Sequence, residues 1–424
     1  PRPTELEYRR TTQWAVGDLV HVPFGRPGLA NATGQASALQ AVAAPLPERE
    51  RLWRVIWSEC PGIGWQRLRR LEAFFGSLAA AWKASGEQLI QGLSGRTRLT
   101  TLDLQRLEVY RNQLGPEPLS TVISPEQRRR FRRHCLLAGD PALPPTLLEL
   151  ERPPLQLFWQ GRGSLWPVLR QQRAVAVVGT RRPSRHGETM ARAVGRALAE
   201  AGWPVVSGLA EGIDAAAHIG CLEAGGRPVA VLGTPLERVY PSHHTSLQRQ
   251  VGNAGLLISE LPVGTPVRPG HFAQRNRLQV ALAQAVVLVE CPHHSGALHS
   301  AQRAWDLEMP LWVVPGDAAR VSAAGSNRWL GRGVSALLEP RDLIESLGPG
   351  PLGARAETGG EQAVAVGPLH TREAALLAAL GAGASLQQLC ERLRQSPGQL
   401  SERLLNLELA GLVCGEPGLW WRPC

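Results

Sequence analysis

The sequence predicts an α/β protein whose main domain is a doubly wound parallel sheet. Short apolar runs alternate with helical patterns through the middle of the chain, as they do in repeated βαβ units. Two of these runs lead into turns of small residues, and each turn precedes a helix. The strand-like runs are residues 174–178, 203–206, 229–232, 256–259, 286–290 and 311–314.

The stretch from Ser207 to His218 joins one predicted strand to the start of an Ala-rich helix. Ser207, Gly208 and Gly212 are small, so the backbone can turn tightly there and a ligand can approach it. The first N–H groups of the helix and its positive dipole end face the turn. We therefore expect a phosphate or a carboxylate at this point, whereas Asp214 is better suited to stabilising the first helical turn than to acid–base catalysis.

A second turn of the same kind runs from Gly179 to Pro183 and precedes a helix over residues 187–201. The carboxyl ends of parallel strands lie at one edge of a sheet, and ligands collect there near the point where the strand order reverses. The two turns are thus predicted to contribute to a single site.

A third cluster, from Pro269 to Arg277, stands directly before another predicted helix. Arg275 and Arg277 flank Asn276, and Phe272 lies three residues upstream of Arg275. Together these residues can clamp a phosphate and stack a base. The alternative is that the two arginines pair with Glu260 or Glu290 inside the fold.

Two further turns, at Ser295-Gly296 and at Ser326-Asn327, also stand at predicted helix starts. Such residues serve as helix caps as well as anion ligands. Five turns of this type in one sheet domain favour a shared phosphate pocket over five unrelated caps.

The charge of the chain favours a polyanionic partner. Its 424 residues include 46 Lys and Arg against 36 Asp and Glu, which gives a net charge of +10, and Lys83 is the only lysine. Replacement of Lys by Arg in a GC-rich genome would explain the identity of these residues but not their excess. Arginine also suits bidentate phosphate contacts and base stacking.

Other bulk features exclude several classes of protein. No apolar run reaches 18 residues and no signal-peptide pattern opens the chain, so we expect a cytoplasmic protein without a membrane partner. The seven cysteines lack CxxC spacing, which argues against a disulfide framework and a zinc ribbon.

The pattern along the chain predicts several parts. These are a poorly ordered extension (1–45), a helical domain (46–135), the sheet domain (140–347), a linker (348–367) and a winged helix (368–424).

Two features of the helical domain bear on nucleic-acid binding. The Pro-Gly-x-Gly turn over residues 60–64 is typical of a helix-hairpin-helix unit, whose amides hold a backbone phosphate, or it simply connects two helices. The Arg-rich run 128–134 is either a solvated helix face or an additional phosphate track.

The predicted winged helix is less suited to DNA. Such modules often enter a DNA groove with their third helix. Here that helix carries Glu402 and Glu408 and only one arginine, Arg403. A protein-docking or structural role is therefore at least as well supported.

Signals for catalysis are missing from the sequence. It has no GxGxxG followed by a ribose-binding acid, no Walker motif, no GxSxG elbow and no HExxH. Cys291, His293, His294 and His299 lack a recognised metal-ligand spacing. We expect no catalytic residues, no metal and no cofactor.

Taken together, the motifs resemble the DprA/Smf family of DNA-processing proteins over residues 50–345. The matching segments are Val177–Arg181, Ser207–His218, Val231–Thr234, Tyr240–Pro241, Ser259–Glu260, His271–Arg277, Ser295–Gly296 and Gly325–Asn327. The resemblance implies an extended Rossmann-like domain flanked by an N-terminal SAM or helix-hairpin-helix-like domain and a C-terminal winged helix. It also implies a non-catalytic homodimer that binds single-stranded DNA and loads the RecA recombinase onto DNA covered by single-strand binding protein during natural transformation.

The resemblance assigns the DNA pocket by position. The residues are Gly179, Thr180, Arg181, Ser207, Gly208, Arg268, His271, Phe272, Arg275, Asn276, Arg277, Ser295, Gly296, Ser326 and Asn327. Two positions depart from the family pattern. His294 stands where relatives often carry Arg or Lys before the Ser-Gly pair, and Pro269, with Arg268 beside it, replaces a basic residue seen in some relatives.

Two other functions are compatible with parts of the sequence. A phosphoribohydrolase of the lysine-decarboxylase-like Rossmann class uses related turns, but it relies on a Pro-Gly-Gly-x-Gly-Thr-x-x-Glu motif, and this chain has Ser295-Gly296-Ala297-Leu298-His299 instead. A regulator of double-stranded DNA acting through the winged helix is the third possibility.

Overall fold

The computed structural model describes residues 46–121, 134–140, 142–353, 371–409, 412–416 and 419–423. The predicted extension over residues 1–45, the run Arg128 to Arg133 and most of the predicted linker lie outside these residues. The boundaries of the predicted domains stay predictions.

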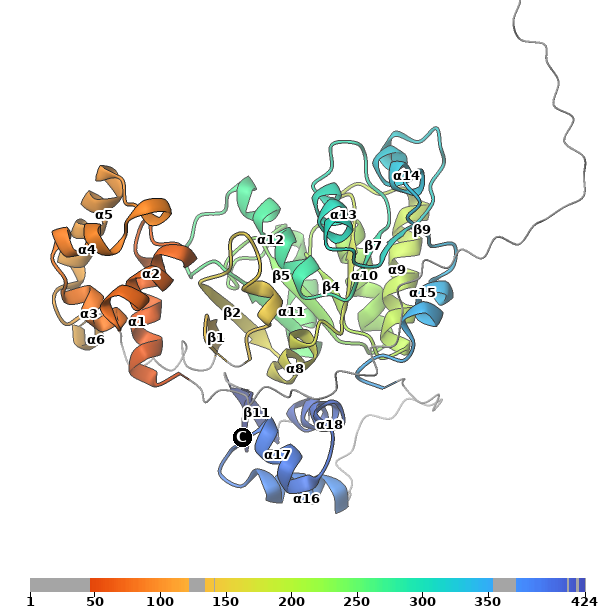
Figure 1. Cartoon of the computed structure of the whole chain (residues 1–424). Helices are drawn as coiled ribbons and strands as arrows, with labels where there is room; N and C mark the ends of the chain where they lie inside the picture. The colour runs from red at the N-terminus through yellow and green to blue at the C-terminus, as the bar shows by residue number, and fades with distance from the viewer. Residues whose placement is uncertain are drawn as a thin grey trace, which may run out of the picture. The chain divides into compact units, whose positions relative to one another are not determined.

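A large mixed sheet forms the centre of the described chain (Figure 1). Its strands, in spatial order, are β1 (Cys135–Leu137), β2 (Gln156–Gly161), β6 (Leu256–Ser259), β5 (Pro228–Leu232), β4 (Val205–Ser207), β3 (Val175–Val178), β7 (Ala285–Leu288), β8 (Leu311–Val313) and β9 (Ser335–Ala336). The strands from β3 to β9 run parallel, whereas β2 is antiparallel to β6 and β1 to β2.

The strand order reverses at β3. The chain continues from β3 through β4, β5 and β6 on one side, and then returns to place β7, β8 and β9 on the other side. The carboxyl ends of β3 and β7 therefore border the switch point, where doubly wound sheets bind ligands.

All six predicted strands are present, and the α/β fold class is confirmed. β1, β2 and β9 were not predicted as strands. β1 and β9 have only three and two residues, too few for a periodic signal. The lead-in predicted around Phe158-Trp159 is part of β2, so it extends the sheet.

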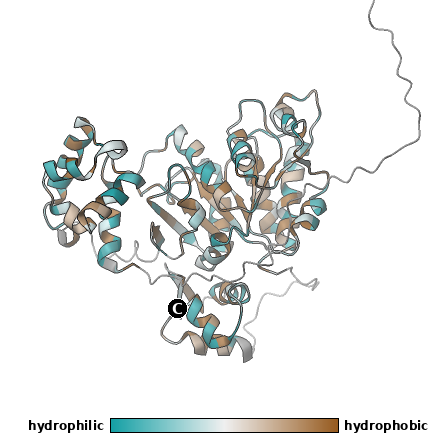
Figure 2. Ribbon diagram, in the orientation of Figure 1, coloured by the Kyte–Doolittle hydropathy of each residue, from teal (hydrophilic) through white to brown (hydrophobic). Residues whose placement is uncertain are grey.

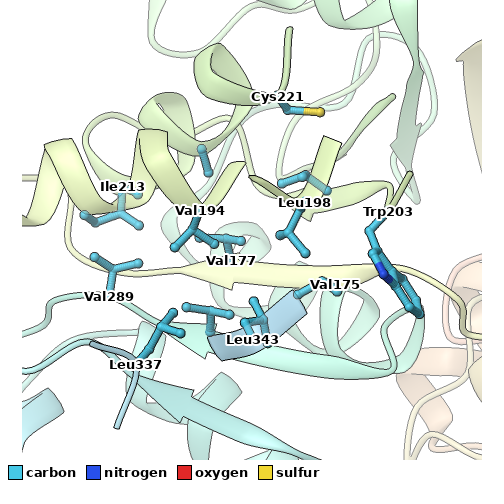
Figure 3. Close-up of a cluster of buried hydrophobic side chains, with 14 of the residues drawn as sticks. Val175, Val177, Val194, Leu198, Trp203, Ile213, Cys221, Val289, Leu337 and Leu343 are labelled. Carbon is cyan, nitrogen blue, oxygen red and sulfur yellow. The ribbon is translucent and has the colours of Figure 1, made fainter. Parts of the chain in front are cut away.

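Helices cover the parallel strands. On one face, α9 (Arg185–Glu200), α10 (Ile213–Glu223) and α15 (Pro340–Leu347) bury a single apolar cluster. Val194 and Leu198 of α9 face Val175 and Val177 of β3 in this cluster (Figure 3). Alternate strand residues point to the opposite face. The remaining helices of this part are α8 (Trp166–Arg170), α11 (Thr245–Ala254), α12 (Pro269–Ala281), α13 (Ala297–Asp306) and α14 (Ala324–Leu330).

Hydrophobic residues concentrate in the strands, and hydrophilic residues lie on the surrounding helices (Figure 2). Val175, Val177, Val286 and Val287 are completely buried. Strands that are apolar on both faces are expected of a parallel sheet covered by helices on both sides. Because both faces of these strands are buried, the strands appear in the sequence as uninterrupted apolar runs, and they could therefore be predicted.

The N-terminal described part is helical, as predicted. Its helices are α1 (Glu48–Glu59), α2 (Trp65–Phe75), α3 (Leu78–Lys83), α4 (Gly86–Gly92), α5 (Thr101–Leu114) and α6 (Pro118–Thr121). The turn over residues 60–64 connects α1 to α2, and Gly62 has a φ of +80°, which favours glycine. Trp57 and Trp82 pack edge to face in the core of this part.

The C-terminal part is a winged helix, as predicted. It consists of α16 (Thr371–Leu380), α17 (Leu386–Leu393) and α18 (Pro397–Leu409) with a sheet of β10 (Ala384–Ser385), β12 (Trp420–Pro423) and β11 (Val413–Glu416).

Glu408, on the third of these helices, makes a protein contact. Its buried carboxylate accepts hydrogen bonds from the backbone N–H groups of Gly163 and Ser164 and from the Ser164 hydroxyl, at 2.6 to 3.2 Å. Arg162 donates to the Glu408 carbonyl at 2.8 Å. These contacts lie within the chain, so they fit the structural alternative considered for this helix.

Two bulk expectations can be compared with the described residues. Cys60, Cys135, Cys221, Cys291 and Cys390 carry free thiols, whereas Cys414 is disulfide-bonded, so the chain is not wholly without disulfides. None of the described helices is long and apolar enough to span a membrane.

Candidate nucleic-acid interface

An open hollow of about 710 Å³ lies at the switch point of the sheet. We call it the switch-point hollow. The loop after β3 (Gly179 to Arg182) and the loop after β7 (Pro292 to Gly296) form two of its walls, and residues from the first turns of α12 form a third. These are the predicted places for a ligand, because strand carboxyl ends and helix starts converge there.

Arg275 is the buried cation of this hollow. Its side chain projects from α12 and its residue is 5% exposed, yet it lines the hollow. Its Nη2 lies 3.4 Å from Oδ2 of Asp214 on α10. Its Nε and Nη1 have no hydrogen-bond partner in the described structure. Two donors of this buried guanidinium are thus left without a partner, on a side chain that borders the hollow.

Burial and charge act against each other in this pair. Burial raises the pKa of the Asp214 carboxyl, and the charge of Arg275 opposes that rise. Burial also lowers the pKa of the Arg275 guanidinium, while Asp214 opposes that change and the neighbouring Arg181 adds to it. An anion bound in the hollow would stabilise the charge on Arg275.

Gly208 provides the space for Arg275. A Cβ atom at residue 208 would lie 1.3 Å from Nη1 of Arg275, and the Gly208 N–H donates to Oδ2 of Asp214 at 3.1 Å. The turn does bind a carboxylate, as its geometry predicted, but that carboxylate belongs to the chain. What approaches the Gly208 backbone is an arginine and not the ligand.

The Phe272 ring contacts two side chains. The Arg181 guanidinium stands over its ring at 5.2 Å from the centroid, and the Tyr240 ring packs 5.0 Å from it on a separate loop. Arg181 is exposed and Phe272 half-buried. This arrangement places a cation and an aromatic ring at the mouth of the hollow, a combination that suits a nucleotide.

Glu290 holds two walls of the hollow together. It follows β7, is 3% exposed, and accepts hydrogen bonds from the Ser184 N–H, the Ser184 hydroxyl and the Ser322 hydroxyl. Its backbone carbonyl accepts from the Thr180 N–H at 2.7 Å. The buried carboxylate is therefore committed to positioning the loops that carry Arg181 and Ser322.

The alternative of internal ion pairs is partly right. Arg277 pairs with Glu260 at 2.6 Å, so this arginine is occupied within the fold. Arg275 pairs with Asp214 and not with Glu260 or Glu290. Asn276 donates to the Gly296 carbonyl at 3.3 Å and so links α12 to the loop after β7.

The structure brings eight of the fifteen predicted site residues to the hollow. They are Gly179, Thr180, Arg181, Phe272, Arg275, Asn276, Ser295 and Gly296.

The other seven predicted residues do not line it. Ser207 and Ser326 are fully buried, and their hydroxyls donate to the carbonyls of Val177 and Ala323. Asn327 exchanges two hydrogen bonds with the Gly316 backbone. Gly208 and Arg277 are engaged within the fold as described above, and Arg268 and His271 lie outside the lining.

Several lining residues were not predicted for the site. They are Val178, Arg182, Ala210, Asp214, Pro269, Ala273, Gln279, Pro292, His294, Ala297, Ser300, Val321 and Ser322. Arg182 could have been predicted from the sequence, because it follows Arg181 in the same turn. No sequence pattern marked Val321 and Ser322 as site residues, because only the tertiary fold brings the loop after β8 to the hollow.

His218 is fully buried on α10, and neither ring nitrogen has a hydrogen-bond partner among the described residues. Burial, together with the charges of Arg275 and His244, lowers its pKa to about 3. The ring is therefore neutral at physiological pH. In the loop of Cys291, whose neighbouring histidines showed no recognised metal-ligand spacing, burial raises the pKa of the Cys291 thiol to about 12. The described residues hold no cluster of three potential metal ligands.

Comparison with known proteins assigns a family. A family model described as DNA recombination-mediator protein A matches residues 134–348, and one described as DprA winged helix domain matches residues 361–418. Protein Smf of Synechocystis sp. is 32% identical over 403 residues, covering 87% of this chain and 98% of that protein. The chain belongs to the DprA/Smf family.

Other DprA/Smf members are similar over much of the chain. Protein Smf of Escherichia coli is 29% identical over 365 residues, covering 84% of this chain and 94% of that protein. The X-ray structure of DNA processing protein A from Streptococcus pneumoniae superposes with a TM-score of 0.57 at 24% identity, covering 71% of this chain and 98% of that chain. The likeness shows that the DprA/Smf fold is shared.

The role of Gly208 in this DprA/Smf chain can be tested by stability. Gly208→Ala should destabilise the protein by about 2 kcal/mol, because the added methyl group overlaps Arg275 and disturbs its pairing with Asp214. Urea unfolding measures the change. Gly270→Ala is the matched control, since its Cβ would meet nothing within 4 Å. Equal stability of the two variants would contradict this account.

His218 predicts a pH dependence of stability. Its folded-state pKa of about 3 lies below the ordinary histidine pKa of 6.5, so the unfolded chain takes up the proton first as the pH falls. His218 should therefore lower the free energy of unfolding by about 1.4 kcal/mol for each pH unit below 6.5, and it should have no such effect above pH 6.5. His218→Leu should flatten the dependence in urea unfolding at pH 7, 6 and 5, while His293→Gln, at an exposed histidine, should not. An unchanged slope in His218→Leu would refute the assignment.

Proposed function

We propose that this chain binds single-stranded DNA in the switch-point hollow and catalyses no reaction there. The observation that carries the proposal is the position of Arg181 over Phe272, beside the two unpartnered donors of Arg275. The arginines suit the phosphate backbone, and the ring suits an unstacked base.

A single strand fits this combination better than a duplex does. Bases in a duplex are stacked on one another and present only their edges, so an aromatic ring cannot stack on them without separation of the strands. The hollow is open to solvent, and the chain carries a net charge of +10, which favours a polymer of phosphates over a single nucleotide.

The bonding of the carboxylates near the hollow argues against an enzymatic function. Asp214 is paired with Arg275, and Glu290 accepts hydrogen bonds from Ser184 and Ser322. Neither is free to act as the acid or base that a phosphoribohydrolase needs. Incubation with AMP should accordingly release no adenine, and release that depends on either carboxylate would favour the enzyme.

The cellular role in this proposal follows from the family. As a recombination mediator, the protein would protect incoming single strands and load RecA onto DNA covered by single-strand binding protein during natural transformation. It would act as a homodimer in the cytoplasm. The match to the family of recombination-mediator proteins supports this role.

Salt-dependent binding tests the DNA site. Fluorescence anisotropy with labelled oligo-dT should show affinity falling steeply with salt, and Arg181→Ala should reduce the slope of log affinity against log salt by about 0.7, the value for one phosphate of a single strand. Arg249→Ala, at an exposed arginine of α11, removes the same charge elsewhere and should leave the slope nearly unchanged. A flat salt response of the wild-type protein would sink the proposal. Arg275→Ala is a poorer probe, because it leaves Asp214 buried without its partner.

RecA loading is tested separately. The protein should shorten the delay before RecA forms filaments on single-stranded DNA covered by single-strand binding protein, as followed by RecA ATPase activity. Arg181→Ala should weaken this stimulation in proportion to its loss of DNA affinity, and Arg249→Ala should not. Tight DNA binding with no stimulation would leave the DNA site intact and reject the mediator role.

A further inference from the structure

A second hollow also borders the loop after β7. We call it the α13–α14 hollow. It has a volume of about 310 Å³, and its polar and aromatic lining consists of His293, His299, Gln302, Arg328, Trp329 and Arg332. None of the residues assigned to DNA from the sequence lines it.

The chemistry of the α13–α14 hollow resembles that of the switch-point hollow. The Arg332 guanidinium stands over the Trp329 ring at 4.6 Å, which repeats the pairing of Arg181 with Phe272. Arg328 and Arg332 are both exposed, and in the described part of the chain no carboxylate forms an ion pair with either of them. A guanidinium that stacks on a ring keeps its N–H edge available to a phosphate.

The two hollows are held at a fixed separation. Pro292, His294 and Ser295 line the switch-point hollow, whereas the adjacent His293 lines the α13–α14 hollow. The N–H groups of Gly325 and Ser326 at the start of α14 both donate to the Cys291 carbonyl, at 2.9 and 3.1 Å. These bonds fix α14 to the loop that borders both hollows.

We propose that the α13–α14 hollow is a second subsite for the same DNA strand, in which Arg328 and Arg332 bind backbone phosphates. The proposal rests on single-strand binding in the switch-point hollow. It predicts that a short oligonucleotide occupies the first hollow alone and that a longer one gains affinity from both.

Oligonucleotides of two lengths separate the two subsites. Anisotropy titrations with dT6 and dT20 would use the full chain, wild type and Arg328→Ala/Arg332→Ala. The double variant should bind dT20 roughly tenfold more weakly and lose about 1.4 from the salt slope, as expected for two phosphates, while its dT6 affinity stays unchanged. Arg328→Lys/Arg332→Lys should restore most of the salt slope, because it retains both charges.

The control is Arg196→Ala/Arg249→Ala, which removes two exposed arginines of α9 and α11. Unchanged dT20 binding by the Arg328/Arg332 variant, equal weakening for both lengths, or equal weakening in the control would each overturn the subsite. If wild-type protein binds dT6 and dT20 with no salt dependence, the proposed function itself fails. Thermal unfolding of each variant verifies that the fold is retained.

Discussion

The buried contact of Arg275 with Asp214 is the interaction on which the site depends. It joins α12 to the first turn of α10 beneath the switch point, and it exists because residue 208 has no side chain. A buried cation with one carboxylate partner and two unpartnered donors is incompletely compensated. An anionic ligand would supply the missing partners, so this contact is consistent with the proposed phosphate site.

The exposed half of the site is organised differently. Glu290 fixes the loops after β3 and β8 through hydroxyl and amide donors, with no cation in the set. This leaves Arg181 free to lie over Phe272 at the mouth of the hollow. A buried carboxylate that accepts several hydrogen bonds positions loops well, because each lost bond leaves a desolvated charge. The exposed cation at the mouth of the hollow is thereby separated from the carboxylate that positions the loops.

In the winged helix, too, a buried carboxylate accepts hydrogen bonds from within the chain. Glu408 on α18 accepts bonds from the backbone at Gly163 and Ser164, so an acidic residue on the helix that such modules often place in a DNA groove is used for a protein contact. Glu408 was one of the sequence features that argued against groove binding, together with Glu402 and the single arginine of this helix.

The sequence by itself determined the parallel sheet, the winged helix and the two loops that carry Gly179 to Arg181 and Ser295 to Gly296. These features depend on local patterns: apolar strands of a sheet covered on both faces, helical periodicity and small residues at strand ends. Tertiary structure alone decided which side chains line the switch-point hollow. Arg275 and Arg277 stand two residues apart on one helix, yet one lines the hollow and the other is paired with Glu260. Ser207, Ser326 and Asn327 look like anion ligands in the sequence but satisfy backbone groups in the fold. The reason is physical: a polar group bonds to whichever partner the packing brings within about 3 Å, and that partner is distant in sequence.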